Sequence, residues 1–564
     1  MSQDIIIVLG IFAVFGAVWV INLASQKNRM AYIQMLLKEE WGVGHPKEYT
    51  YEEFEWISHY YRNRQERGSV NGLVIDDITW NDLEMDEIFL QMNHTYSDIG
   101  EAYLYDLIRR PQVEEEVLQE REQLITYFAE HEEARKKLQT KFYEIGKVAK
   151  VPVSDYIYRL LEVKKKSNIP HYLAIGGLAA AVLLAFFQIT AGVVAFIVVM
   201  GVNINRYYKE KQQIEGYIST FSYVMKLLDI SSRFEKIDIP EVERYMQKIA
   251  KANSRFKKFQ KGASLVVAGR HMGASVTEFI MDYFRMLFHV DLIKFNSMLE
   301  EFQKNLDAVE CIMETLGFLD SMIAIASYRK SLNYYCIPKL EKQRTAFFYS
   351  EEMYHPLIEE PIANTIKEER GVLITGSNAS GKSTFLKTAA INALLAQTVH
   401  TCPARVYHAC YFQIYSSMAL KDNLQGQESY YIVEIKSLKR ILNHVEENIP
   451  VLCFVDEVLR GTNTIERISA SAQILKSLAK ENVMCFAATH DIELTHLLEE
   501  KYSNYHFQEE VKENDIRFDY LLYKGRAVSR NAIKLLGIIG YDDRIIKEAE
   551  KTAKHFVDTG IWSL

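Results

Sequence analysis

The chain has 564 residues, 48% of them hydrophobic and 25% charged, and its formal net charge at pH 7 is −8. This length implies about three or four domains, and the apolar content is enough to give them ordered cores. The negative balance excludes a general attraction to nucleic-acid phosphates, because non-specific DNA affinity comes mainly from Lys and Arg. The six cysteines have no metal-binding spacing and are typical of a reducing cytosol.

The first predicted element is a transmembrane helix at residues 5–24. This segment carries no charge, and at about 1.5 Å per residue it spans a hydrocarbon core of about 30 Å. A cleaved signal peptide is the alternative, although the segment lacks a basic n-region and is long for an h-region. Asp4 precedes it, whereas Lys27 and Arg29 follow it. The positive-inside rule therefore places the N-terminus outside and the bulk of the chain in the cytoplasm.

A second uncharged run, residues 172–202, predicts a membrane hairpin. Basic residues flank it on both sides, which favours two arms that enter and leave on the same side. Residues 188–192 can form the turn, which leaves two arms of about 15 residues, short for full spans. One long tilted helix is an alternative, but it would put residues 74–165 and 212–564 on opposite sides. A buried hairpin in a soluble protein is the other alternative.

A basic stretch, residues 248–277, lies in a region of long predicted helices. Only Pro240 and Pro338 interrupt the chain between positions 171 and 355, which suits uninterrupted helices. The stretch contains no acid, so it could grip DNA or the anionic face of a membrane. A solvated helix face is the alternative. The candidate contact residues are Lys251, Arg255, Lys257, Lys258 and Lys261.

A phosphate-binding loop is predicted where the apolar run 371–375 leads into Gly376-x-x-x-x-Gly381-Lys382-Ser383. Glycine lets the backbone approach a phosphate closely, and the N-terminus of the following helix favours an anion. We expect Lys382 to contact the β and γ phosphates of ATP and Ser383 to hold Mg²⁺. A chance Gly-rich turn is the alternative. The predicted nucleotide-binding residues of the loop are Gly376, Ser377, Asn378, Ala379, Ser380, Gly381, Lys382, Ser383 and Thr384.

Two further strand-like runs end in polar residues that suit ATP hydrolysis. Residues 451–455 predict a buried parallel strand that ends in Asp456 and Glu457. Asp456 would orient Mg²⁺, and Glu457 would polarise the attacking water. An acidic strand-to-helix turn is the alternative. The run 484–488 ends beside His490, which could reach the γ phosphate. The catalytic candidates are Glu457, His490 and Lys382.

These segments resemble the ATPase domain of the MutS family, the mismatch-recognition branch of the ABC-type ATPases. In the family's G-x-S-T-F-M-V-E segment, a serine reaches the nucleotide of the partner subunit, and Ser429 aligns with that serine. The resemblance therefore implies ATP and Mg²⁺ as ligands and a homodimer. Four further stretches are similar to the family's His-Pro with I-A-N, G-x-S-T-F-M-V-E, R-G-T-S-T and A-T-H-x-x-E-L segments, at 355–364, 426–434, 460–464 and 488–494.

The resemblance extends to both sides of the ATPase region. Residues 74–127 resemble the start of the MutS lever domain, with Asn93, Thr95 and Gly100 matching the turn near its beginning. Residues 529–549 resemble the family's C-terminal helix-turn-helix, which helps to pair ATPase domains. The mismatch-reading wedge and the DNA clamp of the soluble family members are not evident, which argues against mismatch specificity.

The ATPase region departs from the family pattern at several positions. The family loop reads G-P-N-M-G-G-K-S, whereas this chain has Ser377, Ala379 and Ser380 and keeps the Gly-Lys-Ser end. Pro361 stands where an aromatic residue commonly stacks on adenine. Tyr520 aligns with the family's other base-contacting position, and we expect it to contribute to nucleotide binding.

The sequence therefore predicts an α/β ABC-type P-loop ATPase domain joined to an all-α lever domain, with an N-terminal transmembrane helix and a second membrane hairpin. We expect a multi-pass protein of the cell membrane with its ATPase in the cytoplasm. The expected boundaries are 1–25 for the transmembrane helix, 26–73 for a linker, 74–168 and 206–345 for the two parts of the lever, 169–205 for the hairpin, 346–535 for the ATPase domain and 536–564 for the dimerisation segment.

The expected function is Mg²⁺-dependent ATP hydrolysis in a membrane-anchored homodimer, coupled to double-stranded DNA in mismatch-repair-related or branched-DNA processing. The alternative is a membrane-mechanical or signalling ATPase that keeps the MutS motor, contacts membrane lipid and does not bind DNA. A transporter is disfavoured, because three short membrane segments make a small pathway. Fold resemblance alone does not decide between the first two.

Overall fold

The chain forms two compact units, which we describe from a computed structural model. The first unit comprises Met1–Val70, Asn93–Asp106 and Leu124–Ser327, and the second comprises Asn71–Met92, Leu107–Gln123 and Tyr328–Leu564. The predicted transmembrane helix at 5–24 lies outside the described residues except for its last position. The structure describes residues 24–43, 49–68, 72–147, 153–260, 266, 283–377, 380–418, 430–446, 448–459, 462–512, 515–526, 533, 536 and 540–563.

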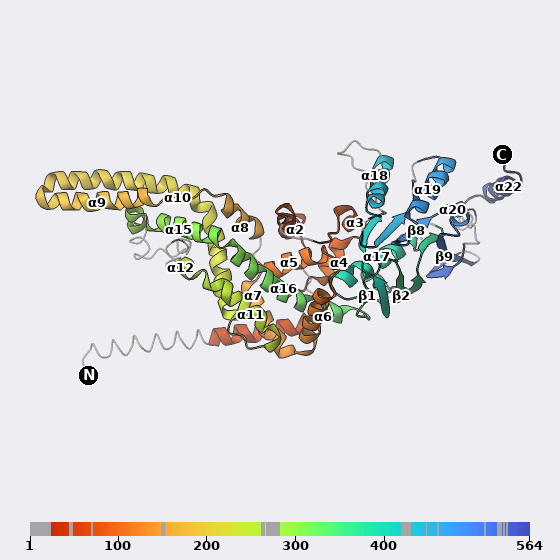
Figure 1. Ribbon diagram of the computed structural model, residues 1–564, viewed down its shortest axis with the longest axis horizontal. Coiled ribbons are helices and arrows are strands. Elements are labelled where there is room, and N and C mark those ends of the chain that lie inside the picture. Colours follow the sequence, from red (N-terminus) through yellow and green to blue (C-terminus); the bar gives the residue numbers. More distant parts are fainter. Residues whose placement is uncertain are drawn as a thin grey trace. The chain divides into compact units, whose positions relative to one another are not determined.

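The first unit is helical throughout its described residues (Figure 1). Its helices begin with local signals that the sequence carries; for example, Thr50 and Glu53 form a capping box at the start of α2. The division between the units falls within α5 (Asp98–Ile108), α6 (Glu115–Glu130) and α16 (Leu306–Ser331). The other helices of this unit are one at 24–39, α2 (Tyr51–Glu66), α7 (Glu132–Ile145), α8 (Val153–Glu162), α9 (Ile169–Phe187), α10 (Ile189–Phe234), η1 (Pro240–Val242), α11 (Glu243–Ser254), α12 (Lys257–Gln260) and α15 (Val290–Lys304).

Helices α9 and α10 form a hairpin that turns at Gln188, within the segment expected to turn (Figure 1). The two arms are in close contact, since a Cβ added at Gly192 would lie 2.3 Å from the Cα of Ala185. The second arm is not a separate short helix, because α10 continues for 46 residues. The expected boundary between hairpin and lever at 205/206 therefore falls inside one helix, and no proline interrupts it.

Within the described residues, two helical segments are long and apolar enough to cross a bilayer, α9 and residues Ile189–Ile218 of α10. Length and composition are the basis for this identification. Most of their side chains are exposed, and at the turn Phe186 and Phe187 are 82% and 90% exposed. Large apolar side chains thus cover the surface of the hairpin without a protein partner in the described part of the chain.

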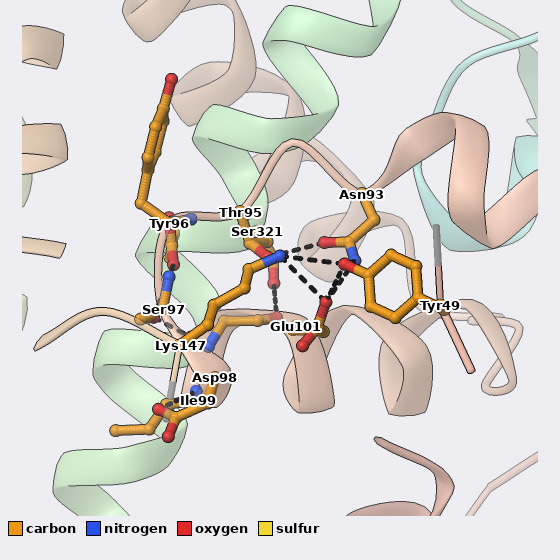
Figure 2. A network of polar contacts seen from close by, with 12 residues as sticks. Tyr49, Asn93, Thr95, Tyr96, Ser97, Asp98, Ile99, Glu101, Lys147 and Ser321 are labelled. Carbon is orange, nitrogen blue, oxygen red and sulfur yellow. Dashed lines mark hydrogen bonds and ion pairs between the residues drawn. The ribbon is translucent and has the colours of Figure 1, made fainter. Parts of the chain in front are cut away.

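A buried polar network connects the turn at residues 93–97 with helix α5 (Figure 2). The amide of Asn93 donates to Glu101 Oε1 at 2.6 Å, and Lys147 Nζ donates to the same oxygen at 2.9 Å. Burial opposes ionisation of Glu101, but Lys147 and the donated hydrogen bonds outweigh it and hold the pKa below its usual value. The hydroxyl of Tyr49 also donates to Glu101. Two of the residues that resemble the lever turn are therefore part of this network: the Thr95 hydroxyl donates to the Asn93 side chain, which in turn donates to Glu101 on α5.

The second unit contains two β-sheets and their covering helices (Figure 1). One sheet has the order β1-β5-β2-β3, and the other has the order β10-β9-β4-β8-β7-β6. All strands of the larger sheet are parallel except for the β9–β10 pair. The elements are α3 (Asp77–Asp82), α4 (Met85–Met92), β1 (Lys339–Glu341), β2 (Phe348–Met353), β3 (Asn364–Glu368), β4 (Gly371–Thr375), α17 (Lys382–Thr398), β5 (Val406–Cys410), β6 (Gln413–Ser417), α18 (Tyr430–Asn443), β7 (Val451–Asp456), α19 (Thr464–Leu478), β8 (Val483–Thr489), α20 (Ile492–Leu497), β9 (Tyr502–Lys512), β10 (Asp515–Lys524) and α22 (Asp543–Thr559).

The three central strands of the larger sheet, β4, β8 and β7, are buried along their whole length. Their near-continuous apolar sequences are typical of parallel strands covered on both faces. Thr375 pairs with Thr489, and Asp456 pairs with Ala488, so the carboxyl ends of the three strands lie at one edge. The predicted site residues follow these ends. The α/β domain expected from the sequence is therefore present.

The boundaries of this unit differ from those expected. Strand β1 begins at Lys339, ahead of position 346, because it pairs with β5. Residues 74–92, expected in the lever, group with the sheet instead. The reason is a set of contacts from α3 to the end of β6, where Asp82 accepts hydrogen bonds from the Ser416 hydroxyl at 2.6 Å and from the Met418 amide at 2.9 Å.

The tight packing of Gly100 against Asp320 yields a stability prediction. A Cβ at Gly100 would lie 2.1 Å from Asp320 Oδ2, and this carboxylate is fixed by the hydroxyl and amide of Ser97 at 2.6 and 3.0 Å. Gly100→Ala should therefore lower the free energy of unfolding by about 1–3 kcal/mol, the usual cost of overpacking. Denaturant unfolding followed by tryptophan fluorescence measures this change.

Gly216→Ala is the matched control, because a Cβ there meets nothing within 4 Å. It removes a glycine from the middle of a helix and should be neutral or stabilising by up to about 1 kcal/mol. Equal stabilities of the two variants would contradict the packing argument.

Candidate functional site

The predicted phosphate loop connects β4 to α17, as its spacing indicates. Gly381 precedes α17 with φ of 104°, and Gly376 leaves β4 with φ of 153°. A Cβ at Gly376 would lie 2.8 Å from the Ser380 hydroxyl and 3.0 Å from the Phe507 carbonyl oxygen. Both glycines are therefore required by the backbone path and by the closeness of β9. Asn378 and Ala379 lie outside the described residues.

Lys382 is buried and lies across the loop. Its Nζ donates to the carbonyl oxygens of Gly376 at 2.9 Å and Ser377 at 2.8 Å. The ammonium group thus donates to two neutral carbonyl oxygens of the loop, and the charged oxygens of a phosphate can replace them as acceptors. The hydroxyl of Ser380 is buried and has no hydrogen-bond partner within the described part of the chain. The loop therefore offers donors that suit a phosphate.

The first carboxylate after β7 meets the first turn of α17. The Ser383 hydroxyl donates to Asp456 Oδ2 at 2.5 Å. A hydroxyl oxygen beside a carboxylate is a donor set of hard oxygens, which Mg²⁺ prefers. The two residues predicted to hold Mg²⁺ are therefore adjacent, and their chemistry fits that ion. Thr384 follows in the same helical turn and is exposed.

The second carboxylate, Glu457, is in contact with His490, with Oε1 and Nε2 2.6 Å apart. These side chains come from the ends of β7 and β8, neighbouring strands in the sheet. Glu457 has φ of 53°, and its amide donates to the Ala488 carbonyl at 2.9 Å. A left-handed conformation costs a non-glycine residue about 1–3 kcal/mol and occurs preferentially at functional sites. The strained backbone turns the Glu457 side chain towards His490.

Two residues that the sequence analysis did not single out hold these turns in place. Glu434 on α18 is buried and accepts a hydrogen bond from the Leu459 amide, just after Glu457. Arg467 on α19 binds Asp491 through two contacts of 2.9 and 2.6 Å, which fixes the residue after His490. The hydrogen bond with Asp491 raises the pKa of Arg467 above its usual value. Glu434 closes the segment that resembles a family motif, whereas no local signal marks Arg467.

Tyr520 lies beside the loop, although no contact with a base is shown. It occupies a bulge in β10 with φ of 54°, and a Cβ at Gly381 would lie 3.2 Å from its ring. The side chain of Asn364 holds the bulge, because its amide donates to the Tyr520 carbonyl at 3.0 Å and its oxygen accepts from the Leu522 amide at 2.7 Å. The asparagine of the I-A-N segment thus positions Tyr520, and the role in base binding stays a prediction.

The other predicted residues are placed as follows. His355, of the His-Pro segment, is buried, and its burial with the nearby charge of Lys387 lowers its pKa to about 4, so it is neutral at physiological pH. Its Nδ1 accepts from the Leu357 amide at 3.3 Å, which is a structural role. Ser429 and Lys261 lie outside the described residues.

Comparisons with known proteins agree with this site. Residues 372–557 match the family model for MutS domain V. The DNA mismatch repair protein MutS of Aquifex pyrophilus is 28% identical over 340 residues, which cover 57% of this chain and 39% of that protein. The proteins of the same name from Thermotoga sp. strain RQ2 and Thermus aquaticus are each 31% identical, over 45% and 35% of this chain and 33% and 24% of their own lengths. The chain thus matches less than half the length of these relatives.

The fold and the site define a class of protein: a P-loop ATPase, in which the predicted phosphate loop, the Ser383–Asp456 pair and Glu457 lie at one edge of a parallel sheet. Within that class, residues 372–557 match MutS domain V, and about half of the chain is similar to MutS proteins.

Replacing Glu457, the predicted base, gives the sharpest test of the site. Glu457→Gln keeps the size of the side chain but removes the negative charge that we expect to polarise the attacking water. We expect kcat for ATP hydrolysis to fall by about 10²–10⁴-fold, the usual contribution of a general base. ATP affinity, measured by equilibrium titration, should be unchanged, because Lys382 and the loop remain.

Glu481→Gln is the matched control for this variant. Glu481 is exposed and lies before β8, whereas Glu457 and His490 lie beyond the opposite end of that strand. A kcat for Glu457→Gln within tenfold of the control would exclude Glu457 as the base.

Proposed function

We propose that the protein hydrolyses ATP to ADP and phosphate at this site, with Mg²⁺ as its cofactor. The observation that carries the proposal is the pair of contacts beside the phosphate loop, Ser383 with Asp456 at 2.5 Å and Glu457 with His490 at 2.6 Å. Phosphoryl transfer requires a loop that binds the phosphates, oxygen ligands for the metal ion and a base for the attacking water.

Each residue has a distinct part in the proposed reaction. Lys382 and the loop amides bind the phosphates of ATP, and Ser383 and Asp456 hold Mg²⁺. The ion neutralises charge that develops on the phosphate oxygens. Glu457 accepts a hydrogen bond from the attacking water, and His490 orients the glutamate through the opposite side of its carboxylate. Positioning and electrostatics, rather than covalent chemistry, would provide the rate enhancement.

We further propose that two copies of the chain share each nucleotide. The resemblance to the family supports this arrangement, in which Ser429 of one subunit reaches the ATP bound by Lys382 of the other. A ligand that contacts both subunits favours the closed dimer through its differential affinity. ATP binding would then close the dimer, and hydrolysis would release it.

A complementation assay tests the shared site. Ser429→Ala and Lys382→Ala subunits are each expected to be inactive alone. Mixed dimers would contain one intact site, so an equal mixture should recover about a quarter of the wild-type rate if subunits pair at random. Ser429→Ala mixed with the double variant is the control and should recover nothing. No recovery in the first mixture would contradict a composite site.

The α9–α10 hairpin supports membrane association of this ATPase. Its exposed apolar side chains form a surface that water disfavours, and both segments are long enough to enter a bilayer. We propose that the hairpin enters the membrane from the cytoplasmic side, that the segment at 5–24 forms a further span with the N-terminus outside, and that ATP-driven closure acts on the hairpin.

DNA coupling is the second candidate, and two observations favour it. The relatives are DNA mismatch repair proteins by name, and α11 and α12 carry the exposed basic residues Lys251, Lys257 and Lys258. The remaining described candidate, Arg255, is engaged in an ion pair with Asp307 at 2.5 Å, which lowers the charge available for phosphate. We therefore place DNA coupling second.

The ATPase rate of the full chain in lipid nanodiscs, with and without duplex and branched DNA at physiological salt, separates the two candidates. Membrane coupling predicts a rate that changes with anionic lipid content and is indifferent to DNA. Stimulation by DNA that is lost in Lys257→Gln/Lys258→Gln, but kept in the control Lys439→Gln/Lys476→Gln, would establish the second candidate instead.

A further inference from the structure

A cavity of about 500 Å³ lies at the foot of the hairpin, where α9 begins and α10 leaves the apolar segment. Its walls contain three basic side chains, Lys166, Arg206 and Lys209, and one carboxylate, Glu210. All of them belong to the first unit. The cavity is therefore net positive, and it lies outside the ATPase unit.

The spacing on α10 places the charged residues on one wall. Lys209 and Glu210 follow Arg206 by three and four positions, and Gln213 follows them by four and three, which puts the four residues on one helix face. Arg206 Nε forms an ion pair with Glu210 Oε1 at 2.9 Å, and this contact orients the guanidinium group. Lys166, which precedes α9, donates to Gln213 Oε1 on α10 at 2.7 Å. Lys209 is exposed and forms no ion pair within the described residues.

A buried polar residue, His171, forms the floor of the cavity. It is 1% exposed, and its Nδ1 lies 3.1 Å from Nδ1 of His289, while its Nε2 lies 3.4 Å from Glu210. His289 is fixed in turn by the carbonyl of Asn203 at 3.0 Å. The floor is thus a connected set of polar groups rather than a gap between apolar side chains.

The cavity has the position of a lipid headgroup relative to the apolar hairpin. Arg206 follows the turn at Gln188 by 18 residues, or about 27 Å of helix, close to the thickness of a hydrocarbon core. Tyr172 and Tyr208 are exposed near the same level, where tyrosine is enriched in membrane proteins because its ring is apolar and its hydroxyl is polar. The basic wall therefore begins where the apolar surface ends.

We infer that this cavity binds the phosphate of an anionic phospholipid headgroup, with Arg206 and Lys209 as its principal contacts. The inference rests on the membrane association proposed above. Acyl chains would continue along the exposed apolar side chains of α9 and α10, and the phosphate would meet two cations that the helix presents together. A zwitterionic choline headgroup would gain less, because its positive charge opposes the same cations.

Titration of the full-length protein in neutral detergent with short-chain lipids tests the inference. Dihexanoyl phosphatidylglycerol should bind at least about tenfold more tightly than dihexanoyl phosphatidylcholine or inorganic phosphate. Arg206→Gln/Lys209→Gln should weaken the phosphatidylglycerol complex by at least about tenfold. Lys137→Gln/Lys236→Gln is the matched control, since both lysines are exposed residues of the same unit away from the cavity.

Three results would overturn the inference: equal affinity for phosphatidylglycerol and phosphatidylcholine, equal affinity for inorganic phosphate, or no difference between the two double variants. Arg206→Lys keeps the charge and should retain binding, which separates loss of charge from loss of folding. Alkaline extraction of membranes tests anchoring independently. If alkaline extraction releases a chain that still binds lipid, membrane anchoring is contradicted and the lipid site is not. If the chain stays in the membrane but shows no headgroup selectivity, the lipid site is contradicted and anchoring is not.

Discussion

The parallel register of β4, β8 and β7 is the constraint on which the site depends. It brings the loop after Thr375, the carboxylates after Val455 and the histidine after Thr489 to one edge of the sheet. Because all three strands are buried on both faces, a shifted register would misplace apolar side chains along their whole length. The short contacts of Asp456 and Glu457 are possible only because this core fixes where each strand ends.

The placement of the candidate site residues at one sheet edge was predictable, whereas the contacts that support them were not. The loop, Asp456, Glu457 and His490 follow apolar runs directly, so local spacing predicts them. Tertiary packing brings together two supporting pairs that one sequence does not reveal. These are Glu434 with the amide of Leu459 and Arg467 with Asp491. The same limit applies to α3, whose attachment to β6 depends on residues more than 300 positions apart. The hairpin turn was predictable because the composition changes locally at residues 188–192. The end of the second arm was not, because charged residues follow the apolar part of α10 without a residue that ends the helix.

The departures of the loop from the family pattern have a structural counterpart in β9. The hydroxyl of Ser377 binds Glu509, and the space beside Gly376 is limited by Ser380 and by the carbonyl of Phe507. The side chain of Ser377 thus contacts the neighbouring strand, while Gly376 and Gly381 keep the backbone path that phosphate binding needs.

Helix α10 gives the hairpin a mechanical property. It extends unbroken from Ile189 to Phe234, a length of about 69 Å, and its final residue is buried against Phe142 with ring centroids 5.0 Å apart. The same helix is already packed at Asn203 and Tyr207, which bond to Leu287 and Asp291. The part before Asn203 is about 21 Å long, so a tilt of about 10° at Asn203 would displace the turn of the hairpin by about 4 Å. Small rearrangements among the helices that hold Asn203 and Tyr207 would thus move the apolar turn.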